Sequence, residues 1–207
     1  GVQMSVSDSQ KQIRKFTRAY CEKDDRIAAL SYFGSYAVFF AALFASAILW
    51  ATPWLAVPLA MFAGVCGVRL YVLQHDCGHH SLFATKRAND LAGYGLSLIT
   101  LTPYRAMQYN HNVHHYYVGN LDHREAGEVH TMTLAEWNDA PWWHRLAYRI
   151  YRNPAFMMFV GGFFVFFLHY RWPKSTIKAG LWKGVLAHNA MLAAFLFSLW
   201  AIFGWPG

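Results

Sequence analysis

The sequence predicts an all-α membrane protein with about four transmembrane helices, arranged as two hairpins with a histidine-rich region between them. Residues of the AVILMFWYC set make up 56% of the 207 residues and charged residues only 14%, against about 25% charged in a soluble globular domain. The apolar residues are gathered into long runs. Between the runs lie two histidine-rich stretches, residues 75–80 and 111–115.

The formal net charge of +7 raises the question of nucleic-acid binding. Nucleic-acid binders usually gather their basic residues on one polar face. Here they lie between apolar runs, as in the cytoplasmic loops of membrane proteins, so we expect no nucleic-acid partner. The three cysteines lack metal-type spacing and do not indicate a disulfide framework. Cys77, between two histidines, is expected to be a small packing residue.

Residues 1–30 are polar and basic, and we expect them to form a cytoplasmic segment with an interfacial or docking helix. Residues 31–207 are expected to form one membrane domain. Its first two runs, 31–50 and 54–73, are long enough to cross a hydrocarbon core of about 30 Å at about 1.5 Å per residue. The short turn between them makes a hairpin, and the second helix leads directly into His75.

The apolar run 91–101 is only about half the length needed to cross, so it is expected to be interfacial or re-entrant. Both histidine stretches then lie on one side of the membrane. The following region, 103–152, is mostly polar, and its tryptophans suit a helix on the membrane surface. These tryptophans are Trp137, Trp142 and Trp143.

The runs 154–170 and 184–203 are the expected third and fourth spans, the third being short and distorted at Gly161-Gly162. Most lysines and arginines fall on the histidine-bearing side, which predicts that this side is cytoplasmic. If successive spans cross the membrane in alternating directions, the loop 171–183 lies on the opposite side together with His188. Four basic residues of that loop are then an exception to the charge pattern: Arg171, Lys174, Lys178 and Lys183.

The histidines of each stretch are spaced to share one face of a helix, because residues three and four apart are neighbours. Neutral imidazole is the commonest protein ligand for transition metals. The candidate ligands are therefore His75, His79, His111, His114 and His115. His80 turns about 100° away from His79 on a helix, so a supporting role is expected first and metal binding second. The remaining histidines lack such spacing and are expected to be structural or solvent-facing: His123, His130, His144 and His169.

The residue types narrow the choice of metal. A structural zinc site usually contains thiolates, and a hydrolytic one commonly has HExxH; neither is present. Soluble di-iron bundles use glutamates and Glu-x-x-His. The residues alone therefore favour an all-imidazole copper or iron site with oxidative chemistry, acting on something in the membrane.

Two stretches carry a family resemblance. HDCGHHSLF (75–83) and HNVHHYYVGNLDHREAGEVHTMTLAEW (111–137) resemble the first and second histidine boxes of the membrane fatty acid desaturases, most closely the acyl-lipid, Δ12/ω6-like branch. The resemblance extends over roughly residues 30–205. It implies that the five candidate histidines are iron ligands, and that His80 matches a position occupied by histidine in some relatives.

The resemblance also implies an enzyme with two non-haem iron ions, which uses O2 and two electrons from a ferredoxin- or cytochrome-type donor. Its reaction introduces a cis double bond into a fatty acyl chain of a membrane lipid, with no catalytic side chain beyond the metal ligands. A lipid hydroxylase or related oxygenase is the nearest alternative, and a non-catalytic membrane metal-binding protein is a second. The family's third box, another HxxHH cluster, is absent. We therefore expect an N-terminal portion of a longer protein, inactive by itself.

Overall fold

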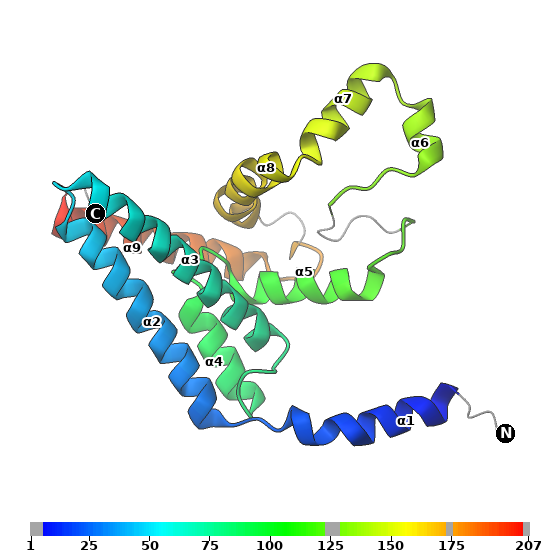
Figure 1. The fold of residues 1–207 in the computed structure, drawn as a ribbon, viewed down its shortest axis with the longest axis horizontal. Coiled ribbons are helices and arrows are strands. Elements are labelled where there is room, and N and C mark those ends of the chain that lie inside the picture. The colour runs from blue at the N-terminus through cyan, green and yellow to red at the C-terminus, as the bar shows by residue number, and fades with distance from the viewer. Residues whose placement is uncertain (1–5, 123–128, 173–175, 205–207) are drawn as a thin grey trace.

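The computed structural model describes residues 6–122, 129–172 and 176–204, and over these residues it contains helices and no strand (Figure 1). Four helical segments are long and apolar enough to cross a membrane. They are Asp25–Ile48, Pro53–Gly78, Pro154–Arg171 and Trp182–Ile202. The predicted fold class is confirmed.

The first two spans, α2 (Asp25–Ile48) and α3 (Pro53–Gly78), form the expected hairpin. The Asp24 side chain accepts hydrogen bonds from the first backbone amides of α2, and Pro53 opens α3 at a position where proline loses no helical bond. Small residues between the two helices are buried: Ala42, Ala56 and Ala63. The α3 helix is longer than the apolar run, because it continues without a break through His75.

The half-length run forms α4 (Lys86–Leu96), which packs against α3 and then turns back at 97–101. The fully buried Gln74 of α3 holds this turn. Its Nε2 donates to the carbonyl of Gly93 at 3.2 Å and to that of Thr102 at 3.1 Å, while its Oε1 accepts from Thr100 at 2.7 Å. The segment therefore folds back beside α3, as expected of a re-entrant run, and delivers the chain to α5 (Tyr104–Tyr117).

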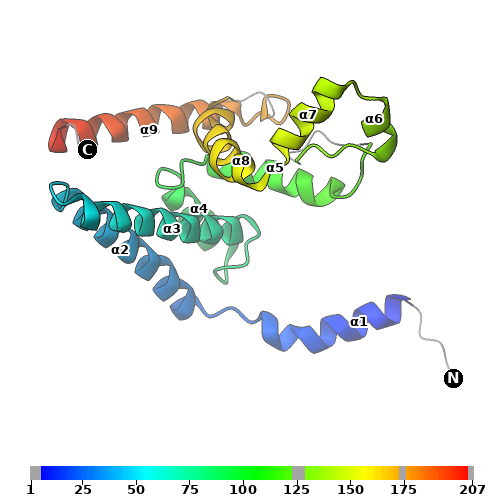
Figure 2. The same cartoon turned by 45° about the horizontal axis from the view of Figure 1, so that its top comes forward.

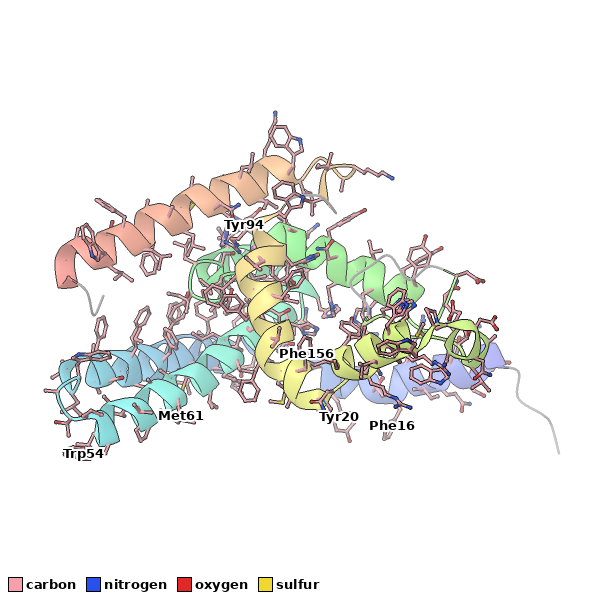
Figure 3. The ribbon with its side chains drawn as sticks, turned by 90° about the horizontal axis from the view of Figure 1, so that it is seen from above. Phe16, Tyr20, Trp54, Met61, Tyr94 and Phe156 are labelled. Atoms are coloured by element: carbon pink, nitrogen blue, oxygen red, sulfur yellow. The ribbon has the colours of Figure 1, made fainter. Side chains whose placement is uncertain are left out.

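Helices are present in the two polar regions where surface helices were expected, residues 1–30 and 103–152. The first is α1 (Val6–Thr17), which is followed by a 3-10 turn, Arg18–Cys21; Phe16 and Tyr20 project from this part of the chain (Figure 3). Two short helices follow the second histidine stretch: α6 (Leu134–Asp139), which has a capping box, and α7 (Trp142–Tyr151). Trp142 and Trp143 are 72% and 59% exposed, as suits a helix that lies on a membrane surface.

The third candidate span is irregular. It begins as α8 (Pro154–Phe156), continues through two π-helical turns, Met157–Gly161 and Phe164–Leu168, and ends in a 3-10 turn, His169–Arg171. The first wide turn ends at Gly161 and the second begins two residues after Gly162, so the distortion lies around the glycine pair, as the sequence suggested. In Figure 3 this segment, which carries Phe156, runs across the direction of the other three long helices.

The fourth span, α9 (Trp182–Phe203), corrects the expected placement of His188 and of the loop 171–183. The helix begins beside the 97–101 turn and ends at the same end of the molecule as the α2–α3 turn (Figures 1 and 2). Arg171 donates to the Leu101 carbonyl, and His188 Nε2 lies 2.9 Å from the Ser97 carbonyl. Both side chains thus contact backbone carbonyls of the 97–101 turn, and the Ser97 carbonyl also accepts from the Thr102 amide at 3.0 Å. His188 and the described loop residues lie at the histidine-bearing end of α3.

Cysteine labelling tests this placement. With the native cysteines replaced, Lys86→Cys and Lys178→Cys are expected to react with a membrane-impermeant thiol reagent from the same side of sealed vesicles. Both positions are exposed. The Ala51→Cys variant, in the α2–α3 turn, is the control and should react from the other side. Reaction of Lys178→Cys together with Ala51→Cys would restore simple alternation and contradict the structure.

Candidate metal centre

Four histidines from two helices converge at the end of α3. His75 lies in the last turn of α3 and His79 caps it, while His111 and His115 share one face of α5. Each of the four offers one ligand nitrogen, and these nitrogens all lie within 4.8 Å of one another. The packing of α3, α4 and α5 thus brings together histidines such as His79 and His111, which are 32 residues apart in sequence.

His111 is at the middle of the group. Its Nε2 lies 2.8 Å from His79 Nε2 and 2.9 Å from His115 Nε2, and its ring centroid is 4.4 Å from that of His75. Partial burial, reinforced by the imidazoles of His75 and His115, lowers the pKa of His79 below its ordinary value and the pKa of His111 to about 4. Both rings are therefore neutral at physiological pH, which is the state that binds a metal.

The donor set fits a transition metal. Imidazole nitrogens suit iron, copper, zinc and nickel, whereas calcium and magnesium prefer oxygen ligands. Asp76 Oδ1 also lies 3.3 Å from His75 Nδ1. Carboxylates in such contact orient a metal-ligating imidazole and fix its tautomer.

His114 lies apart from the four. Its ring centroid is 6.1 Å from that of His111 and 5.9 Å from that of His115. It lines a cavity of about 620 Å³, to which His111 also contributes. The rest of the lining is mostly apolar and comes largely from α3, α5 and the 154–171 segment, with Tyr71, Met107, Phe156, Met157, Phe164 and Tyr170 among its residues. The His114 side chain therefore lies between the histidine group and an apolar cavity.

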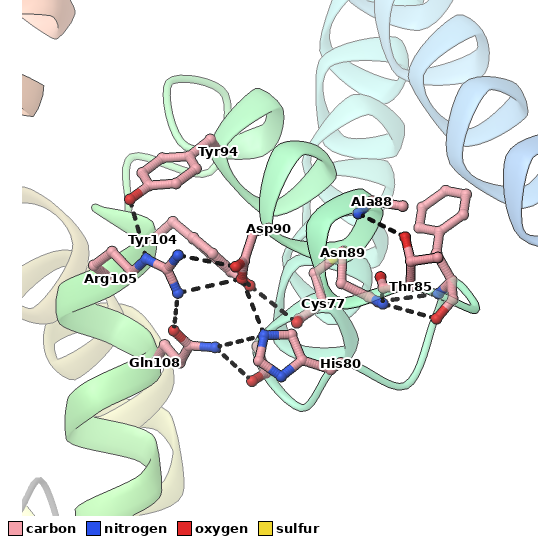
Figure 4. A network of polar contacts seen from close by, with 12 residues as sticks. Cys77, His80, Thr85, Ala88, Asn89, Asp90, Tyr94, Tyr104, Arg105 and Gln108 are labelled. Carbon is pink, nitrogen blue, oxygen red and sulfur yellow. Dashed lines mark hydrogen bonds and ion pairs between the residues drawn. The ribbon is translucent and has the colours of Figure 1, made fainter.

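His80 also lies outside the four, although it is adjacent to His79. Its φ of 54° is in the left-handed region, and its Nε2 is 3.0 Å from Oδ1 of Asp90 on α4 (Figure 4). The same carboxylate accepts hydrogen bonds from Tyr104 Oη at 3.0 Å and from Arg105 Nη2 at 2.9 Å. Burial alone would raise the pKa of Asp90, but the bonds from His80, Arg105 and Tyr104 outweigh it and lower the pKa.

Sequence reasoning did not single out Asp90, Tyr104, Arg105 or Gln108. A polar Asn-Asp pair at the start of a half-length apolar run was the available signal. Cys77 is fully buried against Tyr104 and Met107, which confirms its packing role. His130 and His144 are exposed, as expected. His169 lines the cavity, and His123 lies outside the described residues.

Comparison with known proteins gives a consistent family. A family profile described as "Fatty acid desaturase" matches residues 52–207. The chain is 29% identical to a Bacillus subtilis "Fatty acid desaturase" over 98% of its own length and 58% of that protein. It is 27% identical to an Anabaena variabilis "sn-1 oleoyl-lipid 12-desaturase" over 61% of its length and 36% of that protein.

The name of a third relative includes an electron donor, ferredoxin. The chain is 33% identical to a Nostoc "sn-1 acyl-lipid omega-3 desaturase (ferredoxin)" over 51% of its length and 28% of that protein. The chain thus spans 58% or less of each of these three relatives. No solved structure matches.

Proposed function

Because the chain belongs to the fatty acid desaturase family, we propose that the complete protein is a membrane oxidoreductase that introduces a cis double bond into a fatty acyl chain, using O2 and two electrons. The observation that carries this proposal is the convergence of four imidazoles beside an apolar cavity. Oxidative chemistry on an unactivated methylene needs a redox metal next to a site that holds a hydrocarbon chain.

The metal in this proposal is a pair of iron ions. His75, His79, His111 and His115 would hold one of them, since their ligand nitrogens already lie within 4.8 Å of one another. His114, which lies outside that group and beside the cavity, is our candidate ligand for the second. When bound, iron supplies O2 activation and the removal of hydrogen from the acyl chain. Every other task is one of binding and orientation by the protein.

The cavity is the proposed place for the acyl chain. Its volume of about 620 Å³ is typical of small-molecule sites, which range over about 300–1,000 Å³. Its lining is mostly aromatic, methionine and other apolar side chains, and its polar residues include Asn110, His111, His114 and His169. The cavity therefore presents a hydrocarbon chain to the histidine group rather than a headgroup.

The protein is an integral membrane protein, with four candidate spans. We propose that the histidine group faces the cytoplasm, where an electron donor of ferredoxin or cytochrome type would reach it. The charge pattern supports this side, and Arg171, which donates to the Leu101 carbonyl at the histidine end, now agrees with that pattern. One relative is named as using ferredoxin.

Lipid analysis tests the function. Cells that express the complete protein are expected to accumulate acyl chains with one additional cis double bond, detected by mass spectrometry of the cleaved and derivatised lipids. Cells that express a His79→Ala variant are the control and should lack the product. Hydroxylated chains would show the related oxygenase instead. Metal-loaded protein that forms neither product with a competent electron donor would contradict the enzyme proposal.

A further inference from the structure

The ligands of α5 share a helix face with side chains that bind the end of α3. Tyr104, Gln108, His111 and His115 follow the i, i+4, i+7, i+11 pattern of one face. Tyr104 Oη lies 3.0 Å from the Cys77 carbonyl, and Gln108 Nε2 donates to the Gly78 carbonyl at 2.8 Å. These contacts hold α5 against the last turn of α3 at points about two turns and one turn before His111.

The Asp90 carboxylate joins three segments at that level (Figure 4). It belongs to α4, it accepts from His80 just past the end of α3, and it accepts from Tyr104 and Arg105 at the start of α5. Arg105 binds it through two nitrogens, at 3.2 Å and 2.9 Å. Such a two-point ion pair restricts geometry as well as adding energy. The Asp90 side chain is only 16% exposed, so water competes little for these bonds.

His80 is held in a backbone conformation that a histidine does not adopt freely. Its φ of 54° costs energy, so the conformation persists only where surrounding contacts maintain it. The imidazole contact with Asp90 and a hydrogen bond from Lys23 Nζ to the His80 carbonyl, at 2.5 Å, supply those contacts. The left-handed turn points the His80 ring toward Asp90, while the ring of its neighbour His79 meets His111 at 2.8 Å.

We propose that His80 and Asp90 are a positioning pair, which sets His79 against His111 by tying the end of α3 to α4 and α5 and binds no metal itself. This inference rests on the proposed function only in taking His79 and His111 as metal ligands. Groups that orient metal ligands without touching the metal typically change metal affinity by about 10–100-fold when they are removed.

Cobalt titration of the purified chain in detergent tests the pair, since bound Co(II) reports both affinity and ligand geometry through its visible absorption. Asp90→Asn is expected to weaken Co(II) binding by about 10–100-fold and to shift the spectrum, with the number of bound ions unchanged. His80→Asn should have the same effect, because asparagine tolerates a left-handed backbone but cannot reach Asp90. The double variant should be no worse than Asp90→Asn alone, because that substitution already perturbs the contact that His80→Asn removes.

Three further variants make the outcome decisive. Asp139→Asn, at an exposed site on α6, is the matched control and should change nothing. Arg105→Lys keeps the charge but loses the two-point contact with Asp90, so it should weaken Co(II) binding and shift the Co(II) spectrum less than Asp90→Asn does. It also tests the role of Asp90 if the Asp90→Asn variant does not fold. His111→Ala should lose the ion altogether; if it does not, the proposed metal site itself is wrong.

Loss of the ion by His111→Ala with unchanged binding by Asp90→Asn and His80→Asn would overturn the positioning pair alone. Loss of one bound ion by His80→Asn, with Asp90→Asn unaffected, would make His80 a metal ligand and would also overturn it.

Discussion

Replacing His111 with alanine is expected to abolish stable metal binding by the chain. His111 Nε2 lies within 2.9 Å of two other imidazole nitrogens, and its ring is 4.4 Å from that of His75. No other side chain of the group contacts all of the rest so closely. Removal of a group that only orients a metal ligand lowers metal affinity by about 10–100-fold. Removal of the His111 ligand itself should therefore lower it by more than about 100-fold. Anaerobic Fe(II) loading followed by gel filtration and metal analysis measures the effect.

The matched control is His144→Ala. His144 is exposed on α7 and stacks on Trp143, away from the four histidines. It should keep the metal content of the unmodified protein, which separates the loss of a ligand from the general loss of an imidazole. Equal metal content in the two variants would remove His111 from the ligand set.

The second large effect is expected from Gly93→Ala. A Cβ at position 93 would lie 2.2 Å from Tyr104 Cε2, far inside contact distance. Tyr104 is 1% exposed, and its hydroxyl is held by the Cys77 carbonyl and Asp90, so the ring has little room to move. Overpacking of this kind costs about 1–3 kcal/mol. Thermal unfolding in detergent, followed by circular dichroism, should show a lower midpoint and, through Tyr104, weaker metal binding.

Two comparisons isolate the cause. Gly64→Ala, in α3, would place its Cβ with nothing within 4 Å, so it should leave stability unchanged or raise it by up to about 1 kcal/mol. In a Tyr104→Leu background, Gly93→Ala should cost much less than in the unmodified chain, because the clashing ring is gone. An equal cost in both backgrounds would show that the Tyr104 contact is not the reason.

Much of this fold can be predicted from the sequence. The lengths of the apolar runs predict four spans because a helix must cover the hydrocarbon core with about 20 apolar residues. The spacing of His75 with His79, and of His111 with His115, predicts shared helix faces because the helix repeat is fixed. The structure adds that the two faces meet, with ligand nitrogens within 4.8 Å.

The remaining features depend on contacts between distant residues. Helix spacing predicts that the His80 ring turns away from the His79 ring, but the left-handed turn at His80 and its contact with Asp90 depend on a residue of α4. The direction of α9 likewise depends on His188 meeting a carbonyl 91 residues earlier. Hydropathy and local spacing carry no information about such pairings. The assumption that successive spans alternate in direction therefore placed His188 at the end opposite to the histidine group.

The length of the continuous helix α3 determines how far His75 lies from the α2–α3 turn. It runs for 26 residues from Pro53, so its axis is about 39 Å long, whereas the hydrocarbon core is about 30 Å thick. His75, 22 residues after Pro53, stands at about 33 Å. If Pro53 lies at the far surface of the hydrocarbon core, the length of α3 places His75 a few ångströms beyond the opposite surface of that core. In the proposed reaction a methylene would have to reach that depth, and the length of α3 would decide how far it moves.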